Sequence, residues 1–293
     1  MVLTELEILR DKLLDEGVCY VVVLGMGGSS LCPEVLRTSI GSKDGYPELI
    51  VLDSTVPRAI TAVEQSIDLA DTIFLVSSKS GTTTEVHSLY RHFRALMDRC
   101  VGVAAGSHFI TITDSGSPLE DIAQREGFRK VFHSDPDVGG RYSAFTHFGI
   151  VPAALIGVDL HALVSRGQEA MASCDPGIPL VENPGAYLGA ELGAHYQMGR
   201  DKLTFVTSPK LAGFQLWAEQ LLAESTGKDS QGILPIVSEP AAAAEPAAAE
   251  ARGSPTSFPG GLEEAAHESA AGAGEISCRR GRSDVSEGIC QSQ

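Results

Sequence analysis

Residues 20–30 read YVVVLGMGGSS, a short apolar run that passes directly into glycines and serines. Valine is β-branched and favours extended backbone, so the apolar run is predicted as a buried strand. Gly25, Gly27 and Gly28 predict a tight turn after it, and helical spacing of apolar residues begins at Cys32. A strand, a glycine-rich turn and a helix make up the first half of a βαβ unit, which favours a parallel sheet.

The same alternation continues along the chain. The strand at 20–24 is followed by apolar runs that predict further parallel strands at 49–52, 73–76, 109–113 and 131–132. Segments with helical spacing separate these runs, at 32–40, 57–67, 83–100 and 118–126. We therefore expect a three-layer α/β/α domain with a parallel sheet over residues 18–158, preceded by an N-terminal helix at 1–17.

Residues 159–238 predict a second α/β unit that is incomplete. A helix over 148–173 leads into it, and its further elements are expected to be helices at 183–198 and 212–224 and strands at 203–207 and 233–237. Residues 239–293 are low in complexity and rich in Ala, Gly, Ser and Glu. Such a composition cannot bury enough apolar surface to offset its conformational entropy, so this tail is expected to be disordered.

The charge balance argues against one broad class of partner. The chain carries 38 acidic and 22 basic residues, with a net charge of −16 and a pI near 4.8. This charge repels a nucleic-acid backbone, so we expect no DNA or RNA partner. A bound phosphate would have to be held locally by backbone N–H groups, hydroxyls and a few cations, which favours a small phosphorylated metabolite as the ligand.

The remaining composition favours a soluble cytoplasmic protein. The N-terminal segment interleaves charged and apolar residues, unlike a signal peptide, and no apolar run is long enough to span a membrane. The cysteines form no Cys-x-x-Cys pair, so neither a zinc site nor a disulfide framework is expected. These cysteines are Cys19, Cys32, Cys100, Cys174, Cys278 and Cys290.

The turn after the first strand is the first candidate binding site. Gly28 and Ser29 stand at the predicted start of a helix, where unpaired N–H groups can meet an anion. A dinucleotide-binding fingerprint would need a glycine in place of Ser30, although Asp53 stands near the expected position of a ribose-binding acid. A tight turn that binds nothing remains an alternative.

Residues 74–86, FLVSSKSGTTTEV, form the second candidate site at the end of another predicted strand. Gly81 permits a tight turn and Lys79 supplies a cation, so a phosphate could be surrounded by donors at little net positive charge. The hydroxyls come from Ser78, Ser80, Thr82 and Thr83. A hydroxyl-rich helix cap is the alternative, but it explains only some of these residues.

Two further motifs carry charged side chains. The glycine pair before Arg141 can aim its guanidinium from a constrained loop, where a fixed charge stabilises a developing oxyanion. Gln220 and Glu224 are four residues apart and share one helical face. Glu224 follows Leu221, Leu222 and Trp217, and partial desolvation there would suit a general base. The alternatives are an ordinary salt-bridging arginine and an exposed acid in the last turn of a helix.

Together and in this order, the four motifs resemble the glucose-6-phosphate isomerase (phosphoglucose isomerase) family, which is built from two sugar-isomerase (SIS) domains. The resemblance covers residues 17–240 and is closest to the isomerase half of bifunctional transaldolase/glucose-6-phosphate isomerase proteins. It implies an aldose–ketose isomerase that interconverts glucose 6-phosphate and fructose 6-phosphate through a cis-enediol, without a metal or cofactor, and in a homodimer. By position it implies that Glu224 is the base and that Arg141 stabilises the enediolate. The sugar-phosphate role falls on Gly28, Ser29, Ser78, Lys79, Ser80, Thr82, Thr83 and Gln220.

The chain also departs from the family pattern. A histidine that assists ring opening and a late lysine follow the base in the family, whereas the matching sequence here stops near Glu239. His267 lacks the family's sequence context and is not assigned that role. We therefore expect sugar-phosphate binding with weak or no isomerisation. A non-catalytic SIS-type sugar-phosphate binding module and a dinucleotide-dependent oxidoreductase are the competing readings.

Overall fold

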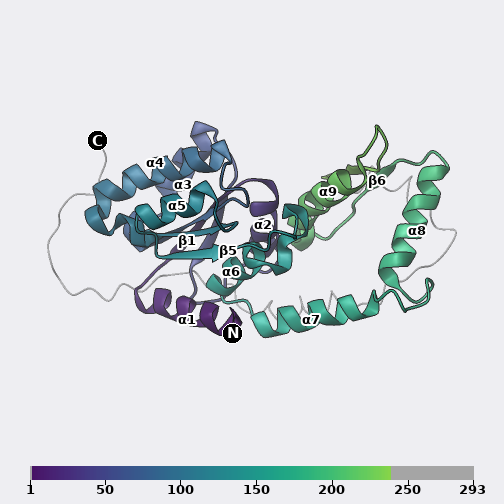
Figure 1. The fold of residues 1–293 in the computed structure, drawn as a ribbon, viewed down its shortest axis with the longest axis horizontal. Coiled ribbons are helices and arrows are strands. Elements are labelled where there is room, and N and C mark those ends of the chain that lie inside the picture. Colours follow the sequence, from purple (N-terminus) through teal and green to yellow (C-terminus); the bar gives the residue numbers. More distant parts are fainter. Residues whose placement is uncertain (1, 239–293) are drawn as a thin grey trace.

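A five-stranded parallel sheet forms the centre of the protein, in a computed structural model that describes residues 2–238 (Figure 1). The strand order is β2-β1-β3-β4-β5, and every neighbouring pair is parallel. The strands are β1 (Tyr20–Gly25), β2 (Glu48–Leu52), β3 (Thr72–Ser77), β4 (Phe109–Thr113) and β5 (Lys130–His133). The predicted α/β fold with a parallel sheet is confirmed. The expected disorder of residues 239–293 lies outside the described residues.

The apolar runs become strands because both faces of the sheet are covered. All residues of β3 are buried, and Val22 at the centre of β1 lies in register with Ile50 on one side and Phe74 on the other. Continuous apolar sequence, rather than alternating polarity, is what a parallel sheet between two helical layers requires. The aromatic rings of Phe74 and Phe93 lie 4.8 Å apart between their centroids and join strand to helix in this core.

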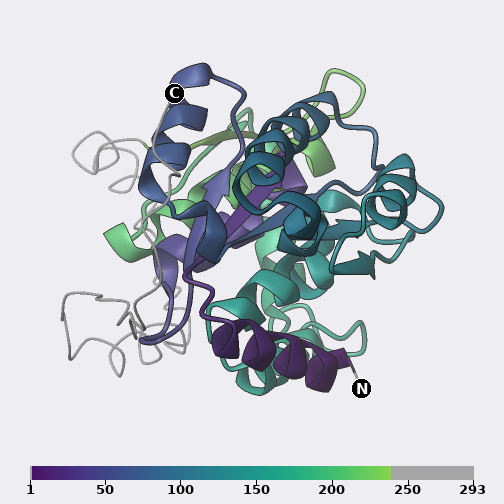
Figure 2. The ribbon, with the colours of Figure 1, turned by 90° about the vertical axis from the view of Figure 1, so that its left-hand side faces the viewer.

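Each face of the sheet has its own helical layer. The helices α3 (Pro57–Ser66), α4 (Thr84–Val101) and α5 (Pro118–Arg125) cover one face. The other face is covered by α1 (Val2–Asp15), α2 (Leu31–Ser39) and α6 (His147–Leu155). Figure 2 shows the layers from a second direction, with α1 in dark purple at the bottom. The result is the predicted three-layer arrangement.

The single helix expected over 148–173 is wrong, because the structure divides it. Helix α6 ends at Leu155, and α7 (Leu160–Ser173) begins after a turn. Gly157 in that turn has a φ of +82°, and a Cβ there would lie 2.8 Å from the ring of Tyr46. Asp159 then caps α7 by accepting a hydrogen bond from the N–H of Ala162 at 3.0 Å. A glycine with positive φ followed by an N-cap ends one helix and starts another.

The elements after α7 form a smaller α/β part whose boundaries as a domain stay a prediction. They are α8 (Pro184–Gln197), β6 (Lys202–Thr204), α9 (Ala212–Thr226) and β7 (Leu234–Ile236), with β6 and β7 paired in parallel. Helix α8 buries no residue and lies far from the sheet (Figure 1). Within residues 2–238, no helix combines the length and apolar character that crossing a bilayer requires.

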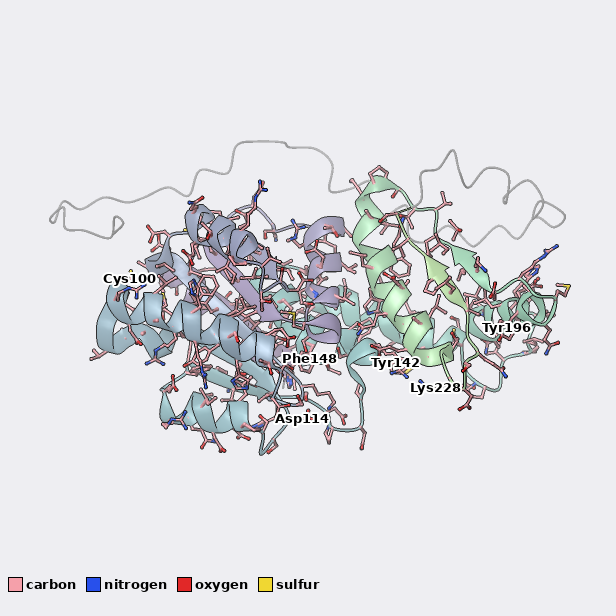
Figure 3. The ribbon with its side chains drawn as sticks, turned by 90° about the horizontal axis from the view of Figure 1, so that it is seen from above. Cys100, Asp114, Tyr142, Phe148, Tyr196 and Lys228 are labelled. Atoms are coloured by element: carbon pink, nitrogen blue, oxygen red, sulfur yellow. The ribbon has the colours of Figure 1, made fainter. Side chains whose placement is uncertain are left out.

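Helix α9 is placed by its contact with α2, beside which it lies in Figure 3. Gly213 is buried at this contact, and a Cβ there would lie 2.2 Å from Oγ1 of Thr38 and 3.4 Å from the carbonyl oxygen of Glu34. Only a residue without a side chain lets the two helices approach this closely. The position of α9, and of every side chain on it, therefore depends on Gly213.

We predict that Gly213→Val displaces α9 from α2 and weakens the docking of α9 alone by about 1–3 kcal/mol, because it overpacks a close helix contact. Trp217, the only tryptophan of the chain, lies on α9 and reports the change. Its fluorescence should shift to the red while the thermal unfolding of the sheet, followed by circular dichroism, changes little. The control is Gly189→Val on α8, where a Cβ meets nothing within 4 Å. Identical tryptophan spectra in both variants would contradict the proposed contact.

Candidate functional site

The four sequence motifs meet at the edge of the sheet where its parallel strands end. A cleft of about 370 Å³ opens there. Its lining residues come from the loops after β1, β3 and β4 and from the segment before Arg141; they are Met26, Gly28, Ser29, Lys79, Ser80, Thr83, Asp114 and Gly140. Ligands of open α/β sheets bind at this end of the strands, so the cleft is the candidate binding site.

The glycine-serine loop forms one side of the cleft and touches the loop that carries Arg141. A Cβ on Gly28 would lie 2.5 Å from the carbonyl carbon of Gly140, so the two backbones are in direct contact. Ser143 bridges them, because its Oγ donates to the carbonyl oxygens of Gly28 at 3.2 Å and Gly140 at 2.6 Å. The carbonyl of Ser29 accepts a hydrogen bond from Oγ of Ser77 at 3.0 Å. Gly28, which was expected to lie close to a bound anion, thus also contacts the loop that carries Arg141.

The hydroxyl-rich loop after β3 is folded on itself by pairs of hydroxyls. The side chains of Ser78 and Thr83 are hydrogen-bonded at 2.9 Å, and those of Ser80 and Thr82 are also 2.9 Å apart. Gly81 has a φ of +64°, which permits the tight turn that both pairs span. Ser78 is only 2% exposed, so its hydroxyl acts inside the loop.

Of this loop, the residues that line the cleft are Lys79, Ser80 and Thr83. Thr83 is also the N-cap position of α4, and its hydroxyl makes no capping hydrogen bond because it pairs with Ser78. The first N–H groups of an α-helix have no intrahelical partner and carry partial positive charge. This end of α4 therefore adds anion-binding capacity beside the hydroxyls.

Lys79 is held by acceptors of the protein. Its Nζ donates to Asp114 at 2.8 Å and 3.1 Å, and to the carbonyl oxygen of Asp135 at 3.0 Å. Asp114 was not identified from the sequence. The signal that could have found it is its place directly after β4, at the same sheet edge as the other motifs.

Arg141 lies against the end of α9. Its neighbour Tyr142 is labelled beside this helix in Figure 3. Nε of Arg141 donates to Oγ of Ser225 at 2.9 Å, and its Nη1 lies 3.4 Å from Oε2 of Glu224. The ring of Tyr142 stacks on the guanidinium at 4.6 Å, and its hydroxyl lies 2.9 Å from Oγ of Ser225. The hydrogen bond with Ser225 and the nearby Arg141 lower the pKa of Tyr142. Sequence reasoning missed both Tyr142 and Ser225, which carry no signal of their own.

Gln220 and Glu224 share a helical face as predicted. Nε2 of Gln220 donates to Oε1 of Glu224 at 2.8 Å, and a Cβ on Gly27 would lie 3.1 Å from the same Nε2. Oε1 of Gln220 is buried and has no hydrogen-bond partner among the described residues. The amide thus lies between the glycine-serine loop and the carboxylate.

The expected partial desolvation of Glu224 beside Leu221, Leu222 and Trp217 is wrong. Its side chain is 48% exposed, because Glu224 lies in the last turn of α9, beyond the buried part of the helix at Gly213 and Ala218. The carboxylate is held instead by polar neighbours, the amide of Gln220 and the guanidinium of Arg141. Neither Glu224, Gln220 nor Arg141 lines the cleft; these three residues form a cluster beside it, joined to it through Gly140.

The dinucleotide-binding reading of the sequence gains nothing from the geometry. Asp53, the residue that suggested a dinucleotide site, is exposed and does not line the cleft. The part of Asp53 that the protein covers is still desolvated, and this partial burial raises the pKa of its carboxyl group. Among residues 2–238, no group of three His, Cys, Asp or Glu side chains is arranged to hold a metal ion.

The chain resembles known isomerases in sequence and in structure. It is 33% identical over 229 residues to a glucose-6-phosphate isomerase of Symbiobacterium thermophilum, in a match that covers 73% of this chain and 50% of that protein. A hypothetical protein of Thermus thermophilus has the same fold with a TM-score of 0.74 and 27% identity, over 85% of this chain and 60% of that one.

A glucose-6-phosphate isomerase of Chlamydia trachomatis also shares the fold, with a TM-score of 0.70, 24% identity, and coverage of 85% of this chain and 50% of that chain. The chain thus spans about half the length of the curated relatives it matches. The family model described as phosphoglucose isomerase matches residues 15–239 and so includes all four motifs. This chain belongs to the phosphoglucose isomerase family.

Proposed function

We propose that this chain acts in the interconversion of glucose 6-phosphate and fructose 6-phosphate, as an aldose–ketose isomerase. The observation that carries the proposal is the pairing of Arg141 with Glu224, 83 positions apart in sequence, next to a cleft rich in hydroxyls. An acid–base group and a fixed cation beside an anion site suit a proton transfer in a phosphorylated sugar.

In this proposal the cleft holds the phosphate. The hydroxyls of Ser80 and Thr83 and the N-terminal end of α4 supply donors at the cleft wall. Gly28, Ser29, Ser78 and Thr82 belong to the same two loops, and with Lys79 they complete the proposed sugar-phosphate site. Anchoring the phosphate away from the reacting carbons orients the open-chain sugar.

Glu224 carries the proton in the proposed reaction. Its carboxylate takes the proton from C2 of the open-chain aldose, and the electron pair moves to the carbonyl oxygen on C1. Arg141 stabilises the negative charge of the resulting cis-enediolate. Return of the proton to C1, with transfer of the hydroxyl proton from O2 to O1, gives the ketose. Gln220 holds the carboxylate in place through its hydrogen bond of 2.8 Å.

A non-catalytic sugar-phosphate binding module is the second candidate. It accounts for the cleft and its hydroxyls, but it gives the contact between Arg141 and Glu224 no role.

The proposal also includes action in the cytoplasm, which is consistent with the free thiols of Cys32 and Cys174. Finally, we propose a homodimer, as the resemblance to the family implies.

We predict that Ser80→Ala weakens the binding of glucose 6-phosphate by about 1.5–3 kcal/mol, because a hydrogen bond to a charged phosphate is lost. The melting temperature should change little, since Ser80 is exposed. Isothermal titration calorimetry measures the affinity. The matched control is Ser88→Ala, an exposed serine on α4 whose Oγ donates to the carbonyl of Thr84 and lies outside the cleft. Equal affinities in both variants would count against the cleft as the phosphate site.

We predict that Glu224→Gln lowers proton exchange about a hundredfold or more while leaving affinity for glucose 6-phosphate nearly unchanged, because the amide cannot act as a base. Nuclear magnetic resonance in heavy water measures deuterium incorporation at C2 and so detects enediol formation even when net turnover is slow. Glu219→Gln, on another face of the same helix, is the control and should exchange at the rate of the unchanged chain. A binding module would show no exchange in any of the three proteins, and unchanged exchange in Glu224→Gln would exclude it as the base.

We predict that Ser225→Ala slows the same exchange about tenfold, because Arg141 loses the acceptor that fixes its Nε. Affinity for the phosphate group should be kept, since Ser225 does not line the cleft. Tyr142→Phe keeps the stacked ring and should slow exchange less. A loss of affinity without a loss of exchange rate in Ser225→Ala would contradict this role.

A further inference from the structure

The ammonium of Lys79 donates its hydrogen bonds to oxygen atoms of the protein itself. An ammonium has three N–H donors. Here Nζ contacts both carboxylate oxygens of Asp114, at 2.8 Å and 3.1 Å, and the carbonyl oxygen of Asp135 at 3.0 Å, with the carbonyl oxygen of Pro136 at 3.4 Å. The side chains of Lys79 and Asp114 are 24% and 30% exposed, so solvent screens the pair only in part. The cation at the cleft wall is thus already neutralised.

Asp114 connects the ends of three neighbouring strands. The carboxylate of Asp114 accepts a hydrogen bond from Nζ of Lys79, which follows β3. The backbone N–H of Asp114 donates to the carbonyl oxygen of Lys79 at 2.9 Å. Its Oδ1 also accepts a hydrogen bond from Oγ of Ser134, which follows β5 and is buried. One carboxylate therefore fixes the hydroxyl-rich loop relative to the segment that continues to Gly140 and Arg141.

The presence of Asp114 is electrostatically unexpected in a site for a phosphate dianion. A carboxylate in the cleft wall repels the ligand, and the chain as a whole already carries a charge of −16. A residue with only this effect would weaken binding. Its contacts supply the compensating effect, because they hold the donors of the hydroxyl-rich loop in one arrangement before the ligand arrives.

We propose that Asp114 is a positioning residue of the sugar-phosphate site, which clamps Lys79 so that the loop at 78–83 and the segment leading to Arg141 keep a fixed separation. The inference rests on the proposed function and deepens it. Lys79 then acts through the loop it holds, while the phosphate is met by hydroxyls and by the end of α4. The competing reading is a Lys79 that turns to the phosphate and pairs with it directly.

The two readings predict opposite signs for one substitution. If Lys79 pairs directly with phosphate, Asp114→Asn removes a competing negative charge and tightens binding. If Asp114 is the clamp, Asp114→Asn weakens binding of glucose 6-phosphate about tenfold, since a charge-assisted contact that orders the loop is lost. Asp114→Glu, which keeps the carboxylate, should retain more affinity than Asp114→Asn. The affinities are measured by calorimetry for glucose 6-phosphate and for inorganic phosphate.

A double-mutant cycle and a charge control complete the experiment. Lys79→Met should weaken binding about as much as Asp114→Asn, and the double variant should lose no more than either single one. Glu85→Gln removes an exposed negative charge from the first turn of α4, near the same loop, and should bind as well as the unchanged chain or slightly better. Tighter binding in Asp114→Asn, or additive losses in the double variant, would overturn the clamp.

Amide hydrogen exchange tests the clamp without any ligand. In Asp114→Asn, exchange should become faster in residues 78–83 and 134–141 together, and stay unchanged in α1, which has no contact with the clamp. Unchanged exchange in both loops would overturn the inference even if no sugar phosphate binds. Faster exchange in both loops together with no binding of glucose 6-phosphate by the unchanged chain would leave the clamp supported and the proposed function refuted.

Discussion

The backbone contact between Gly28 and Gly140 is the constraint on which the site depends. A Cβ on Gly28 would lie 2.5 Å from the carbonyl carbon of Gly140, and Ser143 binds both carbonyl oxygens. This contact joins the end of β1, which lies between β2 and β3 in the sheet, to the segment that carries Arg141. The cleft and Arg141 therefore have fixed positions relative to each other, although they come from distant parts of the chain. A side chain at Gly28 would separate the two loops.

A second close approach, between α9 and α2, brings the proposed base Glu224 next to Arg141. Gly213 lets α9 pack against α2, and α2 itself starts from the loop after β1. The last turn of α9 then reaches Arg141, where Glu224 remains half exposed and is oriented by polar contacts. Burial therefore contributes little to the orientation of this carboxylate. Its neighbours Gln220 and Arg141 orient it through directed hydrogen bonds.

Charge explains why the proposed anion site contains so many hydroxyls. The chain is strongly acidic overall, and the cation of the cleft is paired with Asp114. Attraction over a long distance is then weak, so affinity for a phosphate has to come from donors in fixed positions. The hydroxyls of Ser80 and Thr83 beside the start of α4 provide such donors at short range. Order in the loop replaces net positive charge.

The sheet and the places of the motifs could be predicted from local patterns of residues, because β-branched runs such as residues 20–24 and glycine turns act through their immediate neighbours. The prediction of a single helix over 148–173 was wrong, because the chain turns at Gly157, which packs against the distant Tyr46. The local patterns did not predict that Lys79 is bound by Asp114, 35 positions away, or that Arg141 contacts Glu224, 83 positions away. Those contacts depend on how helices and loops pack in space, which no local pattern of residues encodes.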